Sequence, residues 1–493
     1  MRLICFSVIF TLLTFFKLSA EPVMNKTEQV EQGLRHPVRF VGDFSWSIEE
    51  RMKHYGIPGV SIAVIENYKI SWAKGYGVTD RKTQKKVTTQ TLFQAASLSK
   101  PVSAYGVLKL VEQGNLQLDE AVNQQMISWQ IPKNDLSMKQ PVTIRHLLSH
   151  SGGLTVHGFA GYEVGNKIPN LIEVFKGESP ANNDAIEVNI LPGSKFRYSG
   201  GGYTILQQIM MDVQGGKFSN LMDLLVLKPI GMASSTYNQP LSSEKLTMAA
   251  SGYLPDKTPV KDKHHIYPEM AAAGLWTTAS DYARFVIDVQ LSLNQDNGQV
   301  LSQSTVRQMT TPSLADMGLG FFLQKKGSET YFFHGGWNAG FCSFMTGHPS
   351  GIGVVVMINS NHPQFMLEVI NGVAEVYDWP KYLLPTFKPI PFTKEEFDRI
   401  SGSYDYLNIV DLDIFEEDGK VFAQYSGSPK NELLKTNENE YYRREEDVKI
   451  SFVETENNKN KLVYLKRDGT EMSIERAKFS FLRLISKIRR LWN

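Results

Sequence analysis

FQAASLSKPVSA occupies residues 93 to 104 and places Ser97 and Lys100 three positions apart at the start of a helical pattern. Side chains with this spacing share one face of a helix, with about 5–6 Å between their Cβ atoms. A serine hydroxyl is a weak nucleophile near neutral pH and needs an adjacent base. A lysine in a dry pocket can lose its proton and act as that base, and the helix N-terminus adds donors for a developing negative charge. The stretch therefore makes Ser97 a candidate nucleophile and Lys100 its candidate base.

The S-x-x-K spacing taken alone is a weak signal, because serine and lysine are common residues. On the alternative interpretation, Ser97 only caps a helix and Lys100 is a solvated surface charge. The segments before and after the stretch decide between the two. They are GIPGVSIAVIENYKISWAKGYG at residues 56–77, TIRHLLSHSGGL at 143–154, FRYSGGGY at 196–203 and FFHGGWNAGF at 332–341.

In this order the segments resemble serine β-lactamases, penicillin-binding proteins and their esterase and D-aminopeptidase relatives, in the class C-like branch. The stretch around Ser97 resembles the nucleophile helix of that family, and residues 56–77 resemble its first hairpin. The resemblance covers roughly residues 45–375. It implies an α+β fold, a β-lactamase/transpeptidase-like domain with an antiparallel sheet and a helical subdomain.

Hydrophobic periodicity also predicts an α+β architecture, because strand patterns stand at both ends of this region and helical patterns lie between them. One antiparallel sheet closed by the two ends of the region is therefore expected. The expected strands are 59–65, 69–77, 318–324, 331–333, 341–346 and 353–359. The expected helices are 47–55, 102–112, 143–149, 203–213 and 281–291.

The resemblance also implies further site residues. Tyr198 matches the tyrosine of the Tyr-x-Asn motif, which faces the nucleophile and shares proton transfer with the lysine; a core aromatic is its alternative role. The run His334-Gly335-Gly336 matches the Lys-Thr-Gly strand, where glycines let the backbone approach a substrate closely. In the family, the backbone N–H groups of the nucleophile and of the residue after this motif form the oxyanion hole. Here they would be the N–H groups of Ser97 and Trp337.

Two positions depart from the family pattern. The resemblance implies that Gly200, His334, Gly335 and Gly336 contact the substrate. Gly200 stands where the family has asparagine, so it offers no side chain to bind the amide of an acyl group. His334 stands where the family has lysine, and a histidine is largely neutral above its usual pKa of about 6.5. Both departures weaken recognition of β-lactam or peptide substrates, so we expect a wider range of ester or amide substrates. The alternatives are a true β-lactamase, a D-Ala-directed carboxypeptidase or D-aminopeptidase, and a non-catalytic binding protein on the same scaffold.

No metal or organic cofactor is expected. His146 and His150 stand four positions apart, a spacing that can hold zinc, but no glutamate lies between them as in H-E-x-x-H. Cys342 lies in an apolar run, which favours a buried thiol over a nucleophile. The run Gly200–Gly202 lacks the Lys-Ser/Thr of a phosphate-binding loop.

The N-terminus has the pattern of a secretory signal peptide at residues 1–20. Arg2 supplies a positive charge, an apolar run follows, and Ala20 is a small residue before the expected cleavage point. An uncleaved N-terminal anchor is the alternative. We therefore expect an exported protein, periplasmic or secreted.

The C-terminal part differs from the rest of the chain. A Pro-rich stretch at 380–391 predicts a linker, and short alternating strands predict a small β-barrel at 392–475. The expected strands are 409–414, 420–425, 440–442, 448–453 and 461–465. GSYDY at 402–406 and this strand rhythm resemble the lipocalin-like domain of class C-like hydrolases. Residues 476–493 hold six basic residues and no acidic one, with apolar residues on one helical face. This basic amphipathic tail is expected either to contact a membrane surface or to dock on the protein itself.

The net charge of the chain bears on nucleic acid as a partner. The chain has 52 basic and 51 acidic residues, a formal net charge of +1, which gives no argument for binding nucleic acid. The expected partner is a small-molecule or peptide ester or amide. The sequence does not specify an oligomeric state.

Overall fold

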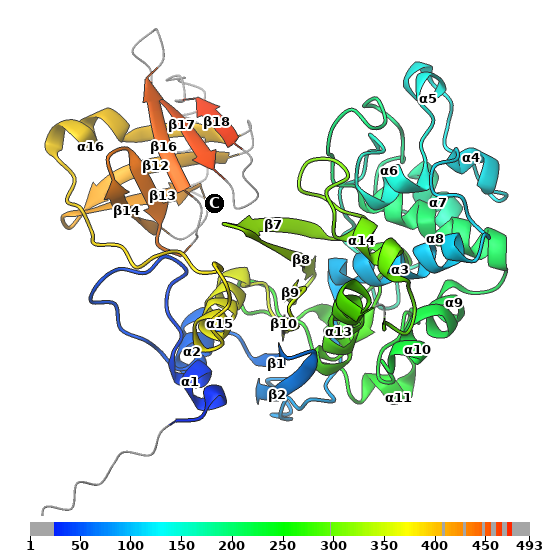
Figure 1. The fold of residues 1–493 in the computed structure, drawn as a ribbon, viewed down its shortest axis with the longest axis horizontal. Helices are drawn as coiled ribbons and strands as arrows, with labels where there is room; N and C mark the ends of the chain where they lie inside the picture. Colours follow the sequence, from blue (N-terminus) through cyan, green and yellow to red (C-terminus); the bar gives the residue numbers. More distant parts are fainter. Residues whose placement is uncertain are drawn as a thin grey trace, which may run out of the picture.

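The computed structural model describes residues 24–295, 297–406, 410–426, 430–445, 449–454, 460–465 and 471–475. The predicted signal peptide and the predicted basic tail lie outside these ranges. The described chain forms a large lobe of sheet and helices, followed by a smaller β lobe that Figure 1 shows in orange and red. Within the described ranges, no helix combines the length and apolar character needed to cross a bilayer.

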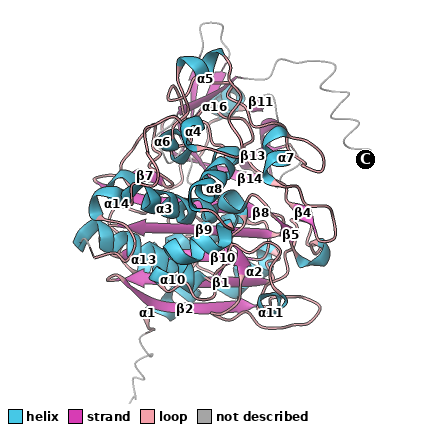
Figure 2. Ribbon diagram, turned by 90° about the vertical axis from the view of Figure 1, so that its right-hand side faces the viewer, coloured by secondary structure: helices cyan, strands magenta, loops and turns pink. Residues whose placement is uncertain are grey.

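A six-stranded antiparallel sheet forms the centre of the large lobe, in the order β2-β1-β10-β9-β8-β7 (Figure 2). β1 pairs with β10, so strands from the two ends of the lobe lie side by side. This confirms the predicted α+β fold with a sheet closed by both ends of the region. The strands are β1 (Gly59–Glu66), β2 (Lys69–Gly77), β7 (Phe322–Lys326), β8 (Glu329–Asn338), β9 (Phe341–His348) and β10 (Ile352–Ile358).

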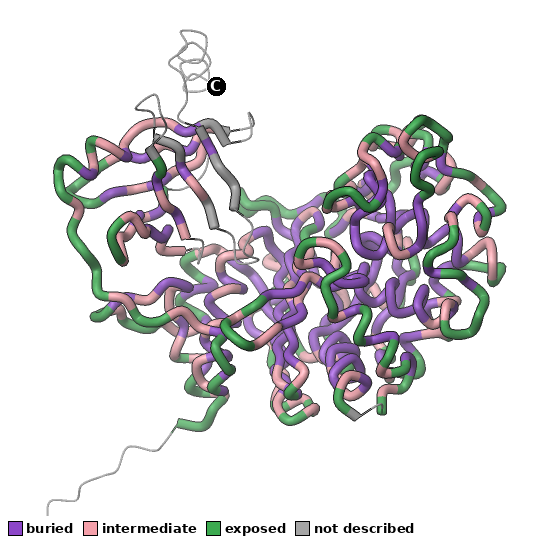
Figure 3. Tube along the Cα trace, turned by 45° about the horizontal axis from the view of Figure 1, so that its top comes forward, coloured by how far each residue is buried: buried purple, intermediate pink, exposed green. Residues whose placement is uncertain are grey.

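Both faces of this sheet are covered, which explains the continuous apolar run of β1. Val60, Ile62 and Val64 pack on one side, against a core that includes residues of α1, α2 and α15. Ala63 and Ile65 point to the other side, into the core shared with α13. Buried residues accordingly fill the centre of this lobe in Figure 3. The four helices are α1 (Lys26–Gln32), α2 (Ile48–Tyr55), α13 (Ala279–Gln295) and α15 (Pro363–Val376).

The helical part of the lobe is built around α3 (Ser99–Glu112) and α8 (Gly200–Gln214), which contact each other. Both are buried along most of their length, so tertiary packing stabilises them. All five predicted helices are confirmed, as α2, α3, α6, α8 and α13. The helices whose bounds have not yet been given are α4 (Val122–Gln125), α5 (Asp135–Lys139), α6 (Ile144–Leu148), α7 (Leu171–Lys176), α9 (Phe218–Met222), α10 (Lys228–Ile230), α11 (Ser243–Leu246), α12 (Met270–Ala273) and α14 (Gln303–Met309).

Short elements complete this lobe. The single turns are η1 (Ala96–Leu98), η2 (Asp223–Leu227) and η3 (Lys261–Lys263). The two-residue strands β3 (Phe93–Gln94) and β6 (Trp276–Thr277) pair with each other, as do β4 (Tyr162–Glu163) and β5 (His265–Ile266). β3 forms the first two residues of the stretch at 93–104 and leads into η1 and α3.

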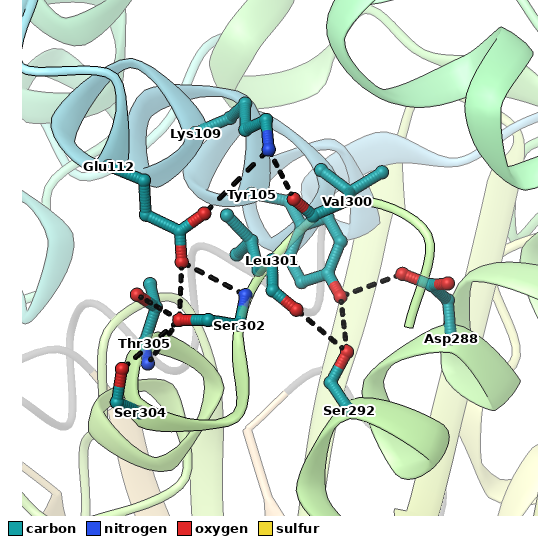
Figure 4. A network of polar contacts seen from close by, with 10 residues as sticks. All are labelled: Tyr105, Lys109, Glu112, Asp288, Ser292, Val300, Leu301, Ser302, Ser304 and Thr305. Atoms are coloured by element: carbon teal, nitrogen blue, oxygen red, sulfur yellow. Dashed lines mark hydrogen bonds and ion pairs between the residues drawn. The ribbon is translucent and has the colours of Figure 1, made fainter. Parts of the chain in front are cut away.

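A polar network fixes the C-terminal half of α3 to α13 and to the segment that follows it (Figure 4). The Tyr105 hydroxyl donates to Asp288 Oδ2 at 2.8 Å. Ser292 Oγ donates to Leu301 O at 3.1 Å, and Ser302 donates to Glu112 Oε1 through both its N–H and its hydroxyl. These bonds anchor the second half of α3, the helix that follows Ser97.

Two predicted strands have different bounds in the structure. The expected strand at 318–324 begins only at Phe322, because Gly318 N–H donates to Phe321 O and Gly320 has a φ of +101°, so these residues form a turn. The expected short strand at 331–333 is the middle of β8, which continues through the glycines to Asn338. Pairing with β9 along this whole length outweighs the low strand propensity of glycine.

The small lobe is a barrel-like antiparallel sheet of eight strands in sequence order, and its first and last strands contact each other. This confirms a small β-barrel-like unit after the Pro-rich stretch. Its core includes Tyr404, Leu412, Tyr441 and Phe452. Three strands and helix α16 (Lys394–Ile400) were not predicted. The strands are β11 (Gly402–Tyr406), β12 (Val410–Glu417), β13 (Lys420–Tyr425), β14 (Asn431–Asn437), β15 (Glu440–Arg443), β16 (Lys449–Glu454), β17 (Asn460–Leu465) and β18 (Glu471–Glu475), of which β11, β14 and β18 are the unpredicted ones.

The N-terminal arm, residues 36–44, joins the two lobes. Phe40 forms a parallel bridge with Phe387 of the Pro-rich stretch, and the Phe387 ring stacks on Tyr442 of the small lobe at 5.4 Å between centroids. Asp43 of the arm forms an ion pair with Arg444. The arm therefore contributes to a separate small core between the Pro-rich stretch and β14–β15.

Candidate active site

Ser97 lies in η1, the single turn that precedes α3. The residue before it, Ala96, has a φ of +50°, a left-handed conformation that costs a non-glycine residue about 1–3 kcal/mol. Two hydrogen bonds stabilise this turn: Ser99 Oγ donates to Ala96 O and Ser343 Oγ donates to Ala95 O, both at 2.6 Å. The turn holds the half-buried Ser97 side chain at a cavity and directs the chain into α3.

Lys100 is buried, with 2% of its surface exposed. Its Nζ lies 2.9 Å from Ser97 Oγ and 2.8 Å from Ala272 O. Burial lowers the pKa of Lys100 to about 7, because desolvation disfavours the charged ammonium. A neutral amine has a lone pair, so it can donate one N–H to Ala272 O and accept the Ser97 proton. The geometry and the electrostatics thus fit a general base.

Tyr198 completes this cluster. Its ring centroid lies 5.0 Å from Lys100 Nζ. Burial raises the pKa of the Tyr198 phenol, and a hydrogen bond with the Ser97 side chain acts in the opposite direction. The phenol is therefore protonated near neutral pH, so in the resting site it is equipped to donate a proton rather than to remove one.

His150 is a further residue of the site, which the sequence did not identify as one. Its imidazole is buried and stacks on the Tyr198 ring at 4.1 Å between centroids. Its Nδ1 accepts a hydrogen bond from the Ser199 N–H at 3.0 Å. His146, four positions earlier, accepts the Thr143 N–H within the capping box of α6. The segment around His150 carried the family resemblance, which was the one signal that could have identified this residue.

His334 points into the same cavity from β8 and has 1% of its surface exposed. Its Nδ1 lies 2.7 Å from Gly335 O; a carbonyl only accepts, so Nδ1 carries the proton and donates it. Burial and the nearby Lys100 lower the pKa of His334 to about 3. His334 is therefore neutral near pH 7, and within the described structure its Nε2 lone pair has no hydrogen-bond partner.

The strand after His334 lies against the Ser97 turn. A Cβ on Gly336 would lie 2.4 Å from Ala95 O and 2.5 Å from Ser343 Oγ, so no larger residue fits there. A Cβ on Gly335 would meet only Phe344 at 3.4 Å, an ordinary contact. Trp337 follows, pairs with Cys342 of β9 and exposes 55% of its surface. The oxyanion-hole role of the Ser97 and Trp337 N–H groups stays a prediction.

Gly200 is the first residue of α8, and it is absent from the residues that line the cavity. Its N–H donates to His157 O at 3.0 Å. A Cβ at this position would lie 3.1 Å from both His157 O and Phe159 Cε2. The loop at 157–159 therefore fills the space that an asparagine side chain would need.

The cavity at Ser97 has a volume of about 790 Å³. Its lining is mostly apolar and aromatic. The lining residues all belong to the described part of the chain. Lys100 is the one lysine among them, and they include no arginine, aspartate or glutamate. They are Ser97, Lys100, His157, Gly158, Phe159, Phe196, Tyr198, Ala272, Ala273, Phe322, Phe333, His334, Gly335, Gly336, Trp337, Asn338, Ser343, Phe344, Pro363 and Met366.

Other candidate groups lie apart from this chemistry. Cys342 is buried, and burial raises the pKa of its thiol to about 12, which disfavours the nucleophilic thiolate. Among the described residues, no three His, Cys, Asp or Glu side chains are grouped so that they could hold a metal ion.

Sequence comparisons relate the chain to known proteins. A family model described as Beta-lactamase matches residues 46–377. Protein flp of Staphylococcus aureus (strain MW2) is 28% identical over 338 residues, which cover 66% of this chain and 64% of that protein. The chain thus spans less than two thirds of the length of that relative. Penicillin-binding protein 4* of Bacillus subtilis (strain 168) is 22% identical over 449 residues, 85% of this chain and 95% of that protein.

Solved structures share the fold. The octameric penicillin-binding protein homologue from Pyrococcus abyssi superposes with a TM-score of 0.59 at 22% identity, and covers 87% of this chain and 98% of its own. The D-alanine carboxypeptidase AmpC from Burkholderia cenocepacia superposes with a TM-score of 0.52 at 21% identity, and covers 67% of this chain and 96% of its own.

Proposed function

This chain belongs to the beta-lactamase family of serine hydrolases, and on that premise we propose that it cleaves an ester or amide bond through an acyl-enzyme on Ser97. The observation that carries the proposal is the 2.9 Å contact between Lys100 Nζ and Ser97 Oγ in a largely apolar cavity. Burial lowers the pKa of Lys100 to about 7, so a large fraction of the amine is neutral at neutral pH. A neutral amine next to a serine hydroxyl acts as a base and activates that hydroxyl as a nucleophile.

In the proposed first step, Lys100 takes the Ser97 proton as Ser97 Oγ attacks the carbonyl carbon. The N–H groups of Ser97 and Trp337 stabilise the oxyanion, a contribution that is typically worth about 10²–10³ in rate. Tyr198 donates its proton to the leaving alcohol or amine and recovers one from Lys100. Water then attacks the acyl-enzyme with the same groups acting in reverse, which releases the acid and restores Ser97.

Two features support a substrate other than a β-lactam or a D-Ala peptide. The loop at 157–159 fills the space next to Gly200, where the family's amide-binding asparagine would stand. His334 is neutral, so it supplies no fixed charge for a substrate carboxylate. A true β-lactamase, a D-Ala-directed peptidase and a non-catalytic binding protein are the outcomes that the following experiment separates.

The experiment is intact-mass analysis after incubation with a fluorophosphonate probe, which reacts with activated serines. We expect one adduct on the wild-type protein, none on Ser97→Ala, and one on Ser304→Ala, a matched change at an exposed serine. Hydrolysis of nitrocefin, D-Ala-D-Ala peptides and short-chain esters is then compared. A folded wild-type protein that forms no adduct would contradict the proposal and favour a binding role.

We further propose that the protein is exported and that residues 476–493 contact a membrane surface. The pattern of residues 1–20 and the basic amphipathic tail support this. Liposome flotation of the full chain and of a chain that ends at residue 475 tests the tail; equal flotation would exclude a role for it.

A further inference from the structure

Four aromatic rings form a continuous stack along one side of the cavity. Tyr198 and Phe322 lie 6.1 Å apart with nearly parallel planes, Phe322 and Phe333 lie 5.5 Å apart, and Phe333 and Phe344 lie 5.7 Å apart. We call Phe322, Phe333 and Phe344 the aromatic ladder. The ladder begins at Tyr198, which belongs to the cluster around Ser97.

Strand register builds this ladder. Phe322 of β7 is the direct partner of Phe333 in β8, and Phe344 of β9 is the partner of Gly335. Residues two positions apart on a strand share one face, so Phe344 and Phe333 lie on the same face of the sheet. Because Gly335 has no side chain, nothing stands between their rings.

The ladder is only partly covered by the protein. Each of its three rings is half-buried and lines the cavity. Trp337, with 55% of its surface exposed, lines the cavity as well. Partly exposed aromatic rings in a concave site are typical of a surface that binds an apolar group.

The charges of the cavity agree with this. Among the lining residues in the described part of the chain, no arginine, aspartate or glutamate occurs, and His334 is neutral. His157 also lines the cavity, and burial lowers the pKa of its imidazole. Lys100 is the remaining basic group, and it already contacts Ser97 Oγ and Ala272 O. A carboxylate bound here would lose its hydration without a dedicated cation in return, which is costly.

We propose that the substrate places an uncharged apolar group, aliphatic or aromatic, on the aromatic ladder and carries no carboxylate beside the scissile carbonyl. This inference rests on the proposed hydrolase function and specifies its substrate class. A cavity of about 790 Å³ has room for a medium-length chain or a ring in addition to the reacting carbonyl.

The first test compares p-nitrophenyl esters of increasing acyl length: acetate, butyrate, hexanoate and octanoate. Each fully buried methylene group can contribute about fourfold to kcat/KM. We expect at least a tenfold rise from acetate to hexanoate. A parallel series of butyrate esters with methyl to hexyl alcohols covers the case in which the leaving group lies on the ladder. A flat response in both series overturns the inference.

The second test addresses charge. p-Nitrophenyl hemisuccinate carries a carboxylate, and p-nitrophenyl pentanoate is a neutral ester of similar length. We expect kcat/KM for the hemisuccinate to be at least tenfold lower. Phe333→Lys adds a cation to the ladder and is expected to raise the hemisuccinate-to-pentanoate ratio at least fivefold. Equal rates for the two esters on the wild-type protein overturn the inference.

The third test assigns the selectivity to the ladder. Phe333→Ala is expected to lower the hexanoate-to-acetate ratio at least threefold, and Phe322→Leu provides a milder change if the first variant does not fold. Phe44→Ala removes a phenyl group with 67% of its surface exposed on the N-terminal arm and serves as the matched control. If Phe44→Ala lowers the ratio as much as Phe333→Ala, the ladder is not responsible and the inference is overturned.

These outcomes distinguish failure of the proposed substrate class from failure of the proposed hydrolase function. A fluorophosphonate adduct on Ser97 with no dependence on chain length or charge leaves the hydrolase proposal in place and overturns the substrate class. Absence of both the adduct and ester hydrolysis overturns both.

Discussion

His150 holds the backbone on both sides of Tyr198. Its carbonyl oxygen accepts the Arg197 N–H at 2.8 Å, and its Nδ1 accepts the Ser199 N–H at 3.0 Å. Its ring stacks on the phenol between these two residues. His150 itself has a φ of +53°, a conformation that non-glycine residues adopt rarely. One residue thus fixes the position, the orientation and one face of the Tyr198 ring, which makes it a positioning residue for that phenol.

Replacement of His150 should therefore weaken catalysis without much change in binding. His150→Ala is expected to lower kcat for p-nitrophenyl butyrate about ten- to hundredfold, because a displaced phenol no longer meets the leaving group. KM should change less than threefold. His150→Asn, which retains a short hydrogen-bond acceptor, should recover part of the loss.

The matched control for this experiment is His146→Ala, one turn earlier and outside the cavity lining. If His146→Ala lowers kcat as strongly, the effect is a general loss of structure. A rise in KM that accounts for the whole loss would also contradict a positioning role.

The pH dependence of Ser97 reactivity should follow Lys100. Burial lowers the pKa of Lys100 to about 7, and only the neutral amine can accept the serine proton. The rate of fluorophosphonate labelling is therefore expected to rise about tenfold per pH unit below pH 6 and to level off above about pH 8. The measurement is labelling by intact mass from pH 5 to 9.

A variant at His334 tests whether this inflection comes from Lys100. Burial lowers the pKa of His334 to about 3, outside the measured range. His334→Gln should therefore keep the inflection near pH 7 even if the overall rate changes. Loss of the inflection in His334→Gln would assign it to the histidine and refute the role of Lys100.

The two glycines of β8 should respond differently to a methyl group. Gly336→Ala would force the strand away from Ala95 O and Ser343 Oγ, and is expected to cost about 1–3 kcal/mol of stability and more than tenfold in labelling of Ser97. The methyl group of Gly335→Ala meets only an ordinary contact, so the free energy of unfolding of this variant should lie within about 0.5 kcal/mol of the wild-type value. Urea unfolding monitored by fluorescence compares the two, and equal destabilisation would contradict the prediction.

The network at the C-terminal half of α3 should contribute to stability. Tyr105→Phe leaves the buried Asp288 carboxylate without the phenol hydrogen bond, and is expected to cost about 1–3 kcal/mol in urea unfolding. Lys109→Met removes a more exposed member of the same network, which donates to Val300 O and pairs with Glu112, and an exposed pair of this kind is worth about 0–1 kcal/mol. If the lysine variant is the more destabilised of the two, the buried hydrogen bond between Tyr105 and Asp288 is not the main source of the stabilisation.

Much of the fold could be predicted because the sheet and the main helices are long and regular. β1 and β10 are apolar runs buried on both faces, and α3 and α8 have clear helical periods. β8 was underpredicted because two glycines follow His334, and glycine has low strand propensity. Its length depends on pairing with β9, a contact that no local pattern reveals.

Some residues of the site could also be predicted from the sequence, and others could not. The contact between Ser97 and Lys100 could be predicted because their spacing places both side chains on one helical face and the surrounding segments resemble a known family. His150 could not, because its role depends on a stack against Tyr198, a residue far along the chain that no local pattern connects with it. Gly200 was expected to face the substrate. The structure instead covers it with the loop at 157–159, whose position depends on tertiary packing.

A ribosome makes the N-terminal arm long before the residues that it contacts. Phe40 contacts Phe387, whose ring stacks on Tyr442, and Asp43 pairs with Arg444, and all three of these later residues are synthesised hundreds of residues after the arm. β1 likewise remains without its β10 neighbour until the chain has been extended through β10. Loop closure over such separations is slow compared with local helix formation. The N-terminal arm is thus among the last described segments to gain its native neighbours, and a nascent chain cannot bury Phe40 against Phe387 until that residue has been synthesised.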